Sequence, residues 1–188
     1  MSKQLIRRTV LTAVFTALIA ASSLFVLPVG PVPVVMTTLF VVLSGMLGGP
    51  WIGLSSVITY LLLGIIGLPV FAGGTAGLAK VMGPTGGFLI GYILAALAGG
   101  LLFHPKEGGS RGMTMVLAAL SALIAGALIY VPGLPWLKYS LSMDWATAIK
   151  AGLLPFIPGF LIKTAAATAL AFSMKDRFRD FLKSGEEE

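Results

Sequence analysis

Six long apolar runs dominate the sequence, and none of them contains an aspartate or a glutamate. They cover approximately residues 6–27, 34–49, 51–67, 85–103, 113–131 and 151–173. A helix of about 20 apolar residues spans the hydrocarbon core of a bilayer, and the second and third runs, separated only by Gly48, Gly49 and Pro50, are close to the minimum. The pattern predicts an all-α membrane protein, a single membrane domain over residues 1–188 built as a bundle of six transmembrane helices.

The composition agrees with a chain that lies almost wholly in the lipid bilayer. Of its 188 residues, 57% are hydrophobic and 11% are charged, whereas about 25% are charged in an ordinary soluble domain. A soluble protein of this length could not hide so much apolar surface from water. The net charge of +6 does not indicate nucleic acid as a partner, because the basic residues sit at the ends of the apolar runs.

The placement of lysine and arginine predicts that both termini are cytoplasmic. With six spans, both ends of the chain lie on one side of the cell membrane. That side would hold Lys3, Arg7, Arg8, Lys106, Arg111, Lys175, Arg177, Arg179 and Lys183. The other side would hold only Lys80, Lys138 and Lys150. Cytoplasmic loops carry the excess of basic residues, so the first side is the inner one.

The apolar runs lack the residue types that catalysis, metal binding and proton coupling need. Proton-coupled carriers usually carry an intramembrane carboxylate; sodium coupling is excluded less strongly, because carbonyls and hydroxyls can hold that ion. The chain has no cysteine, its one histidine is His104 at the end of a run, and it has neither a zinc-protease motif, a nucleophile elbow nor a phosphate-binding loop. We therefore expect no catalytic residue, no metal site and no cofactor, and we expect that any uphill transport takes its energy from another subunit.

Lys163 is the most informative single residue, because it falls near the middle of the last run. A lysine there costs about 2.5–3.5 kcal/mol on insertion scales, so it should face a polar cavity or a partner. One interpretation is contact with an anionic ligand; the other is a side chain that snorkels or bonds backbone carbonyls. Pro155 and Pro158 precede it, and they either free backbone groups for a pocket or simply start the helix.

A segment that is rich in glycine yet apolar, residues 67–84, connects two of the runs. Glycine lets the backbone approach a ligand closely and adopt a positive φ. The segment predicts a re-entrant loop at the outer face, and close packing without a ligand is the alternative. The candidate ligand-binding residues here are Phe71, Gly73, Gly74, Thr75, Lys80 and the following Thr85.

Two further features concern surfaces. Ala13, Ala17 and Ala21 recur every four residues, so they share one face of the first predicted helix; such small residues let another helix approach, either within the bundle or on a partner. Residues 132–150 form a second long connection, which we expect to be irregular, with Trp136, Tyr139 and Trp145 at the membrane interface or, alternatively, lining a pocket.

The string GLPVFAGGTAGLAKVMGPTGGFLIGY at residues 67–92 resembles the signature of the BioY family, the biotin-binding S-components of energy-coupling factor (ECF) transporters. Three further stretches, 32–34, 48–50 and 154–159 with Lys163, match other family landmarks in order. The resemblance implies six helices, a vitamin pocket near the outer face, and partnership with a transmembrane coupling protein and two ATPase subunits that use the ATP. It also implies that Ala13 and Ala17 dock onto the coupling protein.

Two positions depart from the family pattern. Phe160 stands where the family usually has an acidic residue that contributes to biotin recognition, and Thr37 stands where it often has a glutamine. Both changes remove polar groups from the expected pocket. The first interpretation remains a biotin-binding S-component; the alternatives are an S-component for a related carboxylate such as lipoate, and a membrane packing or assembly protein. An intramembrane enzyme is disfavoured.

Overall fold

The structure is a computed structural model that describes residues 3–28, 30–105 and 108–184. Its elements, in chain order, are α1 (Lys3–Ser22), β1 (Val26–Leu27), β2 (Val34–Val35), α2 (Thr37–Ile65), α3 (Leu78–Met82), α4 (Gly86–Leu102), α5 (Arg111–Leu128), α6 (Tyr130–Ser140), α7 (Trp145–Gly152), η1 (Leu154–Phe156) and α8 (Ile157–Lys183). Four helical stretches are long and apolar enough to cross a membrane, and α4 is a shorter apolar helix. The predicted helical membrane architecture is confirmed.

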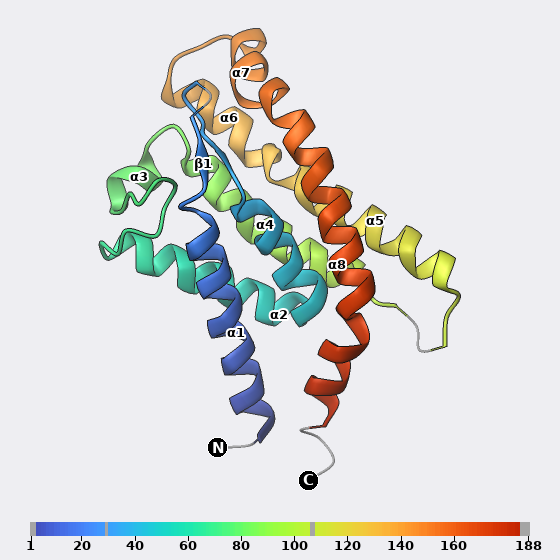
Figure 1. Ribbon diagram of the computed structural model, residues 1–188. Helices are drawn as coiled ribbons and strands as arrows, with labels where there is room; N and C mark the ends of the chain where they lie inside the picture. The colour runs from blue at the N-terminus through green and yellow to red at the C-terminus, as the bar shows by residue number, and fades with distance from the viewer. Residues whose placement is uncertain (1–2, 29, 106–107, 185–188) are drawn as a thin grey trace.

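Helix α2 contains both the second and the third predicted spans. At Gly49 the backbone leaves the helical conformation, with φ 80° and ψ 173°, and Pro50 follows without an N–H to donate. The two halves run in different directions (Figure 1). They pack so closely that a Cβ on Gly53 would lie 2.7 Å from the Cα of Gly45. The sequence break between the two runs is therefore a sharp kink between two packed half-helices.

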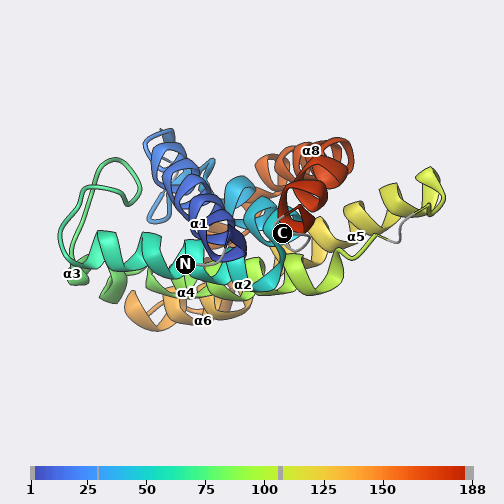
Figure 2. The ribbon, with the colours of Figure 1, turned by 90° about the horizontal axis from the view of Figure 1, so that it is seen from below.

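Small residues also bring α4 against α2. A Cβ on Gly45 would lie 2.0 Å from the carbonyl oxygen of Ala96, and one on Gly100 would lie 2.3 Å from the backbone nitrogen of Pro50. Such contacts leave no room for a side chain, so the two backbones touch, as membrane helices do at small residues. Seen from below, α1 and α8 lie on one side of α2, and α6 lies on the other (Figure 2).

The prediction of an irregular connection over residues 132–150 was wrong. Helix α5 continues through Ile129 into α6, and α7 follows after a short turn. Pro132 lies in the first turn of α6, where its missing N–H breaks no hydrogen bond within α6, whereas Pro135 lies inside that helix. Asp144 caps α7 by accepting the N–H of Thr147, and this hydrogen bond lowers the pKa of the Asp144 carboxyl. Trp136 donates to the carbonyl oxygen of Gly83 at 2.8 Å, which ties α6 to the glycine-rich segment.

The last predicted span, 151–173, is not one helix. Helix α7 ends at Gly152, the short turn η1 follows, and α8 starts at Ile157 and runs to Lys183. Pro155 and Pro158 cannot donate backbone hydrogen bonds, which accounts for the restart of the helix. At its far end α8 meets the beginning of α1, because Arg7 donates to the carbonyl oxygen of Phe181 at 2.7 Å. The beginning of α1 and the end of α8 therefore lie at the same end of the bundle (Figure 1).

Candidate ligand-binding site

Three neighbouring cavities lie between the β1–β2 hairpin, α2, α4, α5, α6 and α8. The Lys80 cavity is lined by Val32, Pro33, Val35, Thr37, Tyr60, Phe71, Ala72, Lys80, Thr85, Phe88, Leu89 and Tyr92. The Lys163 cavity is lined by Val32, Pro33, Val35, Thr38, Phe88, Tyr92, Ile129, Tyr130, Phe156 and Lys163. The Phe160 cavity is lined by Thr38, Leu39, Val42, Ala122, Gly126, Ile129, Tyr130, Phe160, Lys163, Thr164 and Ala167. Each shares several lining residues with the next, so the three adjoining cavities together make up the candidate site.

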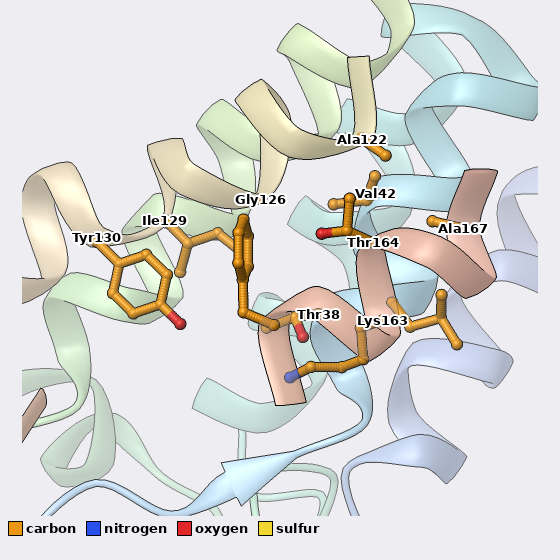
Figure 3. A pocket seen from close by; sticks show the side chains of 11 residues that line it. Thr38, Val42, Ala122, Gly126, Ile129, Tyr130, Lys163, Thr164 and Ala167 are labelled. Atoms are coloured by element: carbon orange, nitrogen blue, oxygen red, sulfur yellow. The ribbon is translucent and has the colours of Figure 1, made fainter. Parts of the chain in front are cut away.

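Lys163 connects two of these cavities. Its side chain is partly buried, and its ammonium donates to the carbonyl oxygen of Val35 in β2 at 3.0 Å. Within the described ranges, no carboxylate forms an ion pair with it. An ammonium group has three donors, and this bond uses only one. Lys163 is thus a half-buried cation with hydrogen-bonding capacity to spare, directed into the site (Figure 3).

Two adjacent hydroxyls at the start of α2 are also unsatisfied. The Oγ1 atoms of Thr37 and Thr38 are both buried and have no hydrogen-bond partner. Buried polar atoms in native proteins are nearly always paired, so each such atom calls for an explanation. Thr37 lines the Lys80 cavity, whereas Thr38 lines the two cavities that contain Lys163.

Aromatic rings make up much of the remaining wall. Phe71, 1% exposed, meets the ring of Tyr60 edge to face at 5.6 Å between centroids. Tyr130 meets Phe88 at 6.0 Å and Phe160 at 6.2 Å, both nearly perpendicular. Edge-to-face packing of this kind fixes the rings relative to one another. The site therefore offers rigid apolar surfaces with tyrosine hydroxyls at their edges, which suits a ligand with an apolar ring or chain.

The glycine-rich segment contributes less directly than the sequence predicts. Gly73 and Thr75 are exposed and Gly74 is partly buried, and none of the three lines the cavities described above. The Thr75 hydroxyl donates to the carbonyl oxygen of Ala72 at 3.0 Å, and the N–H of Gly73 donates to Ser23 at the end of α1 at 3.1 Å. These residues build the turn that inserts Phe71 into the Lys80 cavity.

Among the other predicted residues, some line a cavity and one does not. Lys80 and Thr85 line the Lys80 cavity, and their contact with a ligand stays a prediction. Pro155 is exposed and lines none of the three, and the next residue, Phe156, takes the wall position instead. Sequence reasoning missed Thr38, Tyr60, Phe88, Tyr92, Tyr130 and Phe156. The available signal was a tyrosine inside an apolar run, as at Tyr60 and Tyr92, because its hydroxyl needs a polar partner or cavity there.

The predicted docking face of α1 points away from the bundle. Ala13, Ala17 and Ala21 are all exposed, while Leu11, Phe15 and Ile19 on the opposite face are buried. The alanines therefore do not pack against another helix within the described part of the chain. That leaves their face open to lipid or to a partner.

A larger opening, about 780 Å³ of empty space, lies at the other end of the molecule, near the α2 kink and the end of α8. Its basic residues are already paired in part: Lys175 and Arg179 each contact Asp176 at 2.9 Å. The three cavities around Lys163 contain the unpartnered buried hydroxyls, so they are the better candidate for recognising a specific ligand.

The comparisons with known proteins agree with this geometry. The model of the BioY family matches residues 1–180. The chain belongs to this family. A protein of Thermotoga maritima named biotin transporter BioY is 37% identical over 169 residues, which are 90% of this chain and 96% of the relative. One of Pyrococcus horikoshii, named a probable biotin transporter BioY, is 35% identical over 86% of this chain and 91% of its own length.

One solved structure also matches this BioY chain closely. It is described as the S-component for biotin from an ECF-type ABC transporter, and it superposes with a TM-score of 0.81 at 26% sequence identity. The match covers 94% of this chain and 95% of the other.

Proposed function

We propose that this protein is the biotin-binding S-component of an ECF-type importer. It binds biotin with high affinity at the outer face of the cell membrane, for uptake together with a transmembrane coupling protein and two ATPase subunits. The observation that carries the proposal is the match over nearly the whole chain to a biotin S-component, combined with cavities built from lysines, hydroxyls and aromatic rings.

The chemistry of the site suits biotin. The vitamin combines a fused ring system that bears a cyclic urea with an aliphatic chain that ends in a carboxylate. Phe71, Tyr60 and Phe88 offer apolar walls for the ring and the chain. Lys80 and Lys163 stand in adjoining cavities, so one cation is available to each end of an elongated anionic ligand. Phe160 forms an aromatic wall of the Phe160 cavity beside Lys163.

The remaining roles follow from the same proposal. The chain is not an enzyme and needs no cofactor, because the partner ATPases supply the energy. Both termini face the cytoplasm, and the glycine-rich segment folds back into the outer face as a re-entrant loop. Ala13, Ala17 and Ala21 form the docking face for the coupling protein, supported by their exposure along one side of α1.

Mass spectrometry of ligand retained after gentle extraction tests the function directly, followed by calorimetric titration with biotin, desthiobiotin and lipoate. We expect biotin to co-purify and to bind most tightly. Preference for lipoate would support the related-carboxylate alternative, and retention of no small molecule together with no binding of any of the three would support a packing or assembly role.

A further inference from the structure

The ring end of the proposed ligand presents hydrogen-bond donors that the site must satisfy. Each urea N–H that is buried without an acceptor weakens binding, because it has given up its bond to water. The residues that line the three cavities include no aspartate or glutamate. Lys163 cannot serve either, since an ammonium group donates and does not accept. The acceptor must therefore be a neutral oxygen.

Three buried side-chain oxygens in the described part of the chain have no hydrogen-bond partner: those of Thr37, Thr38 and Ser121. Ser121 lies on α5 and lines none of the three cavities, so its hydroxyl is out of reach of a ligand there. Thr75, in the glycine-rich segment, is exposed, and its hydroxyl is already bonded to the carbonyl oxygen of Ala72. Thr37 and Thr38 are the two candidates that remain among the buried hydroxyls without a partner.

Thr37 and Thr38 face different cavities because they are consecutive residues of α2. Consecutive residues of a helix point about 100° apart, and these two side chains open into different cavities. Thr37 lines the cavity that contains Lys80, whereas Thr38 shares both of its cavities with Lys163 and Tyr130. Figure 3 shows the side chains of Thr38 and Lys163 together at one end of the Phe160 cavity. An acceptor thus stands beside a donor, which is the pairing that a urea, with its N–H and C=O, requires.

We propose that Thr38 is a specificity-determining residue of the site, whose hydroxyl oxygen accepts a ring N–H of the bound ligand. This inference rests on the proposed function, because it presumes a ligand with a cyclic urea. It gives the buried, unpartnered Oγ1 of Thr38 its partner in the ligand-bound state. It also supplies a neutral acceptor in the part of the site where Phe160, an aromatic residue that cannot accept, forms the wall.

The test compares Thr38→Val, which keeps the shape and removes the hydroxyl, with Thr38→Ser, which keeps the hydroxyl. Calorimetric titration of the purified full chain uses biotin and an analogue methylated on the urea nitrogens. We expect Thr38→Val to weaken biotin binding about 5- to 150-fold, and Thr38→Ser to stay within about threefold of wild type. Against the methylated analogue, Thr38→Val should match wild type, because no N–H remains to lose.

Ser121→Ala is the matched control, since it removes a buried unpartnered hydroxyl that lies away from the cavities; it should leave biotin binding unchanged. If Thr38→Val does not fold, as judged by its thermal unfolding, Thr38→Ala carries the same expectation. The inference would be overturned if Thr38→Val bound biotin as strongly as wild type, or if it lost the same affinity for both ligands. Either result would leave the proposed function standing. Absence of biotin binding by wild type would overturn both.

Discussion

Lys163 carries the one charge that α8 places in the candidate site, held by a single hydrogen bond to Val35. We expect Lys163→Ala to weaken biotin binding by roughly 30-fold to several thousand-fold, because removing a buried charged partner typically costs about 2–5 kcal/mol. Calorimetric titration measures the loss. Lys150→Ala removes an exposed lysine of α7 and serves as the control. A folded Lys163→Ala protein that binds biotin within about threefold of wild type would dismiss the role.

At Phe160 the prediction concerns selectivity between ligands. An aspartate there would stand three residues from Lys163 in the same cavity and could accept a urea N–H. We expect Phe160→Asp to tighten biotin binding by about tenfold, as a hydrogen bond to a charged group can, without helping lipoate. Titration of both ligands against wild type, with Phe160→Leu as an uncharged control, checks this. A wild type that prefers lipoate, with the order reversed in Phe160→Asp, would contradict the biotin assignment.

Ten residues were predicted from the sequence to form the ligand site. Six of them line the cavities of the structure, among them Lys163, Phe160 and Thr37. Lys163 can be recognised without a structure because a charge in an apolar run is costly, whereas Phe160 and Thr37 were singled out as departures from the family pattern. Gly73 and Gly74 line none of the three cavities, and their positive φ values, 71° and 74°, belong to a turn whose geometry depends on a contact distant in sequence. Here the distant contact is the carbonyl oxygen of Ser23.

At the scale of elements, α1 provides the clearest test. Its alanine face is exposed, and a bulky side chain there would block the close approach of another helix. We expect Ala13→Trp and Ala17→Trp each to abolish assembly with the coupling protein, while biotin binding stays intact. Co-purification of the complex and titration of the isolated chain measure the two effects. Ala169→Trp places the same side chain on an exposed position of α8 and should leave assembly intact.

If the complex forms normally with either tryptophan on α1, or if biotin binding collapses instead, the alanine face does not dock the partner. The two readouts distinguish a lost interface from a damaged bundle, because the ligand cavities include no residue of α1.

Helices were predictable from the sequence where a long apolar run forms them, and the short helices and strands were not. The long runs correspond to α1, the halves of α2, α4, α5 and α8. Helices α6 and α7 were not predicted: they are short, and α6 holds Pro132 in its first turn, where a proline costs little, and Pro135 in its interior. The β1–β2 hairpin has only two residues per strand, too short for an alternating pattern, yet it brings Val35 to Lys163.

At the scale of the whole molecule, the ligand cavities and the two chain ends are separated along the bundle. The start of α1 and the end of α8 are joined by the bond from Arg7 to Phe181, and the turn between α6 and α7 lies at the opposite end (Figure 1). An S-component must admit its vitamin from outside, so the end that carries α6 and α7 should face outward. The predicted cytoplasmic position of both termini requires the same orientation.

Cysteine labelling can decide this orientation without background, because the chain has no cysteine of its own. Ser184→Cys marks the end of α8, Ser142→Cys marks the turn after α6, and Ser2→Cys marks a position just before the described residues. In intact cells, a maleimide that cannot cross the membrane should label Ser142→Cys and leave the other two unlabelled until the cells are permeabilised. The basic residues near Ser184, among them Lys175 and Arg177, favour this result, since their translocation is disfavoured. Labelling of Ser184→Cys from outside would show that the bundle has the opposite orientation. The cavities around Lys163 would then open toward the cytoplasm, where they could not capture a vitamin for import.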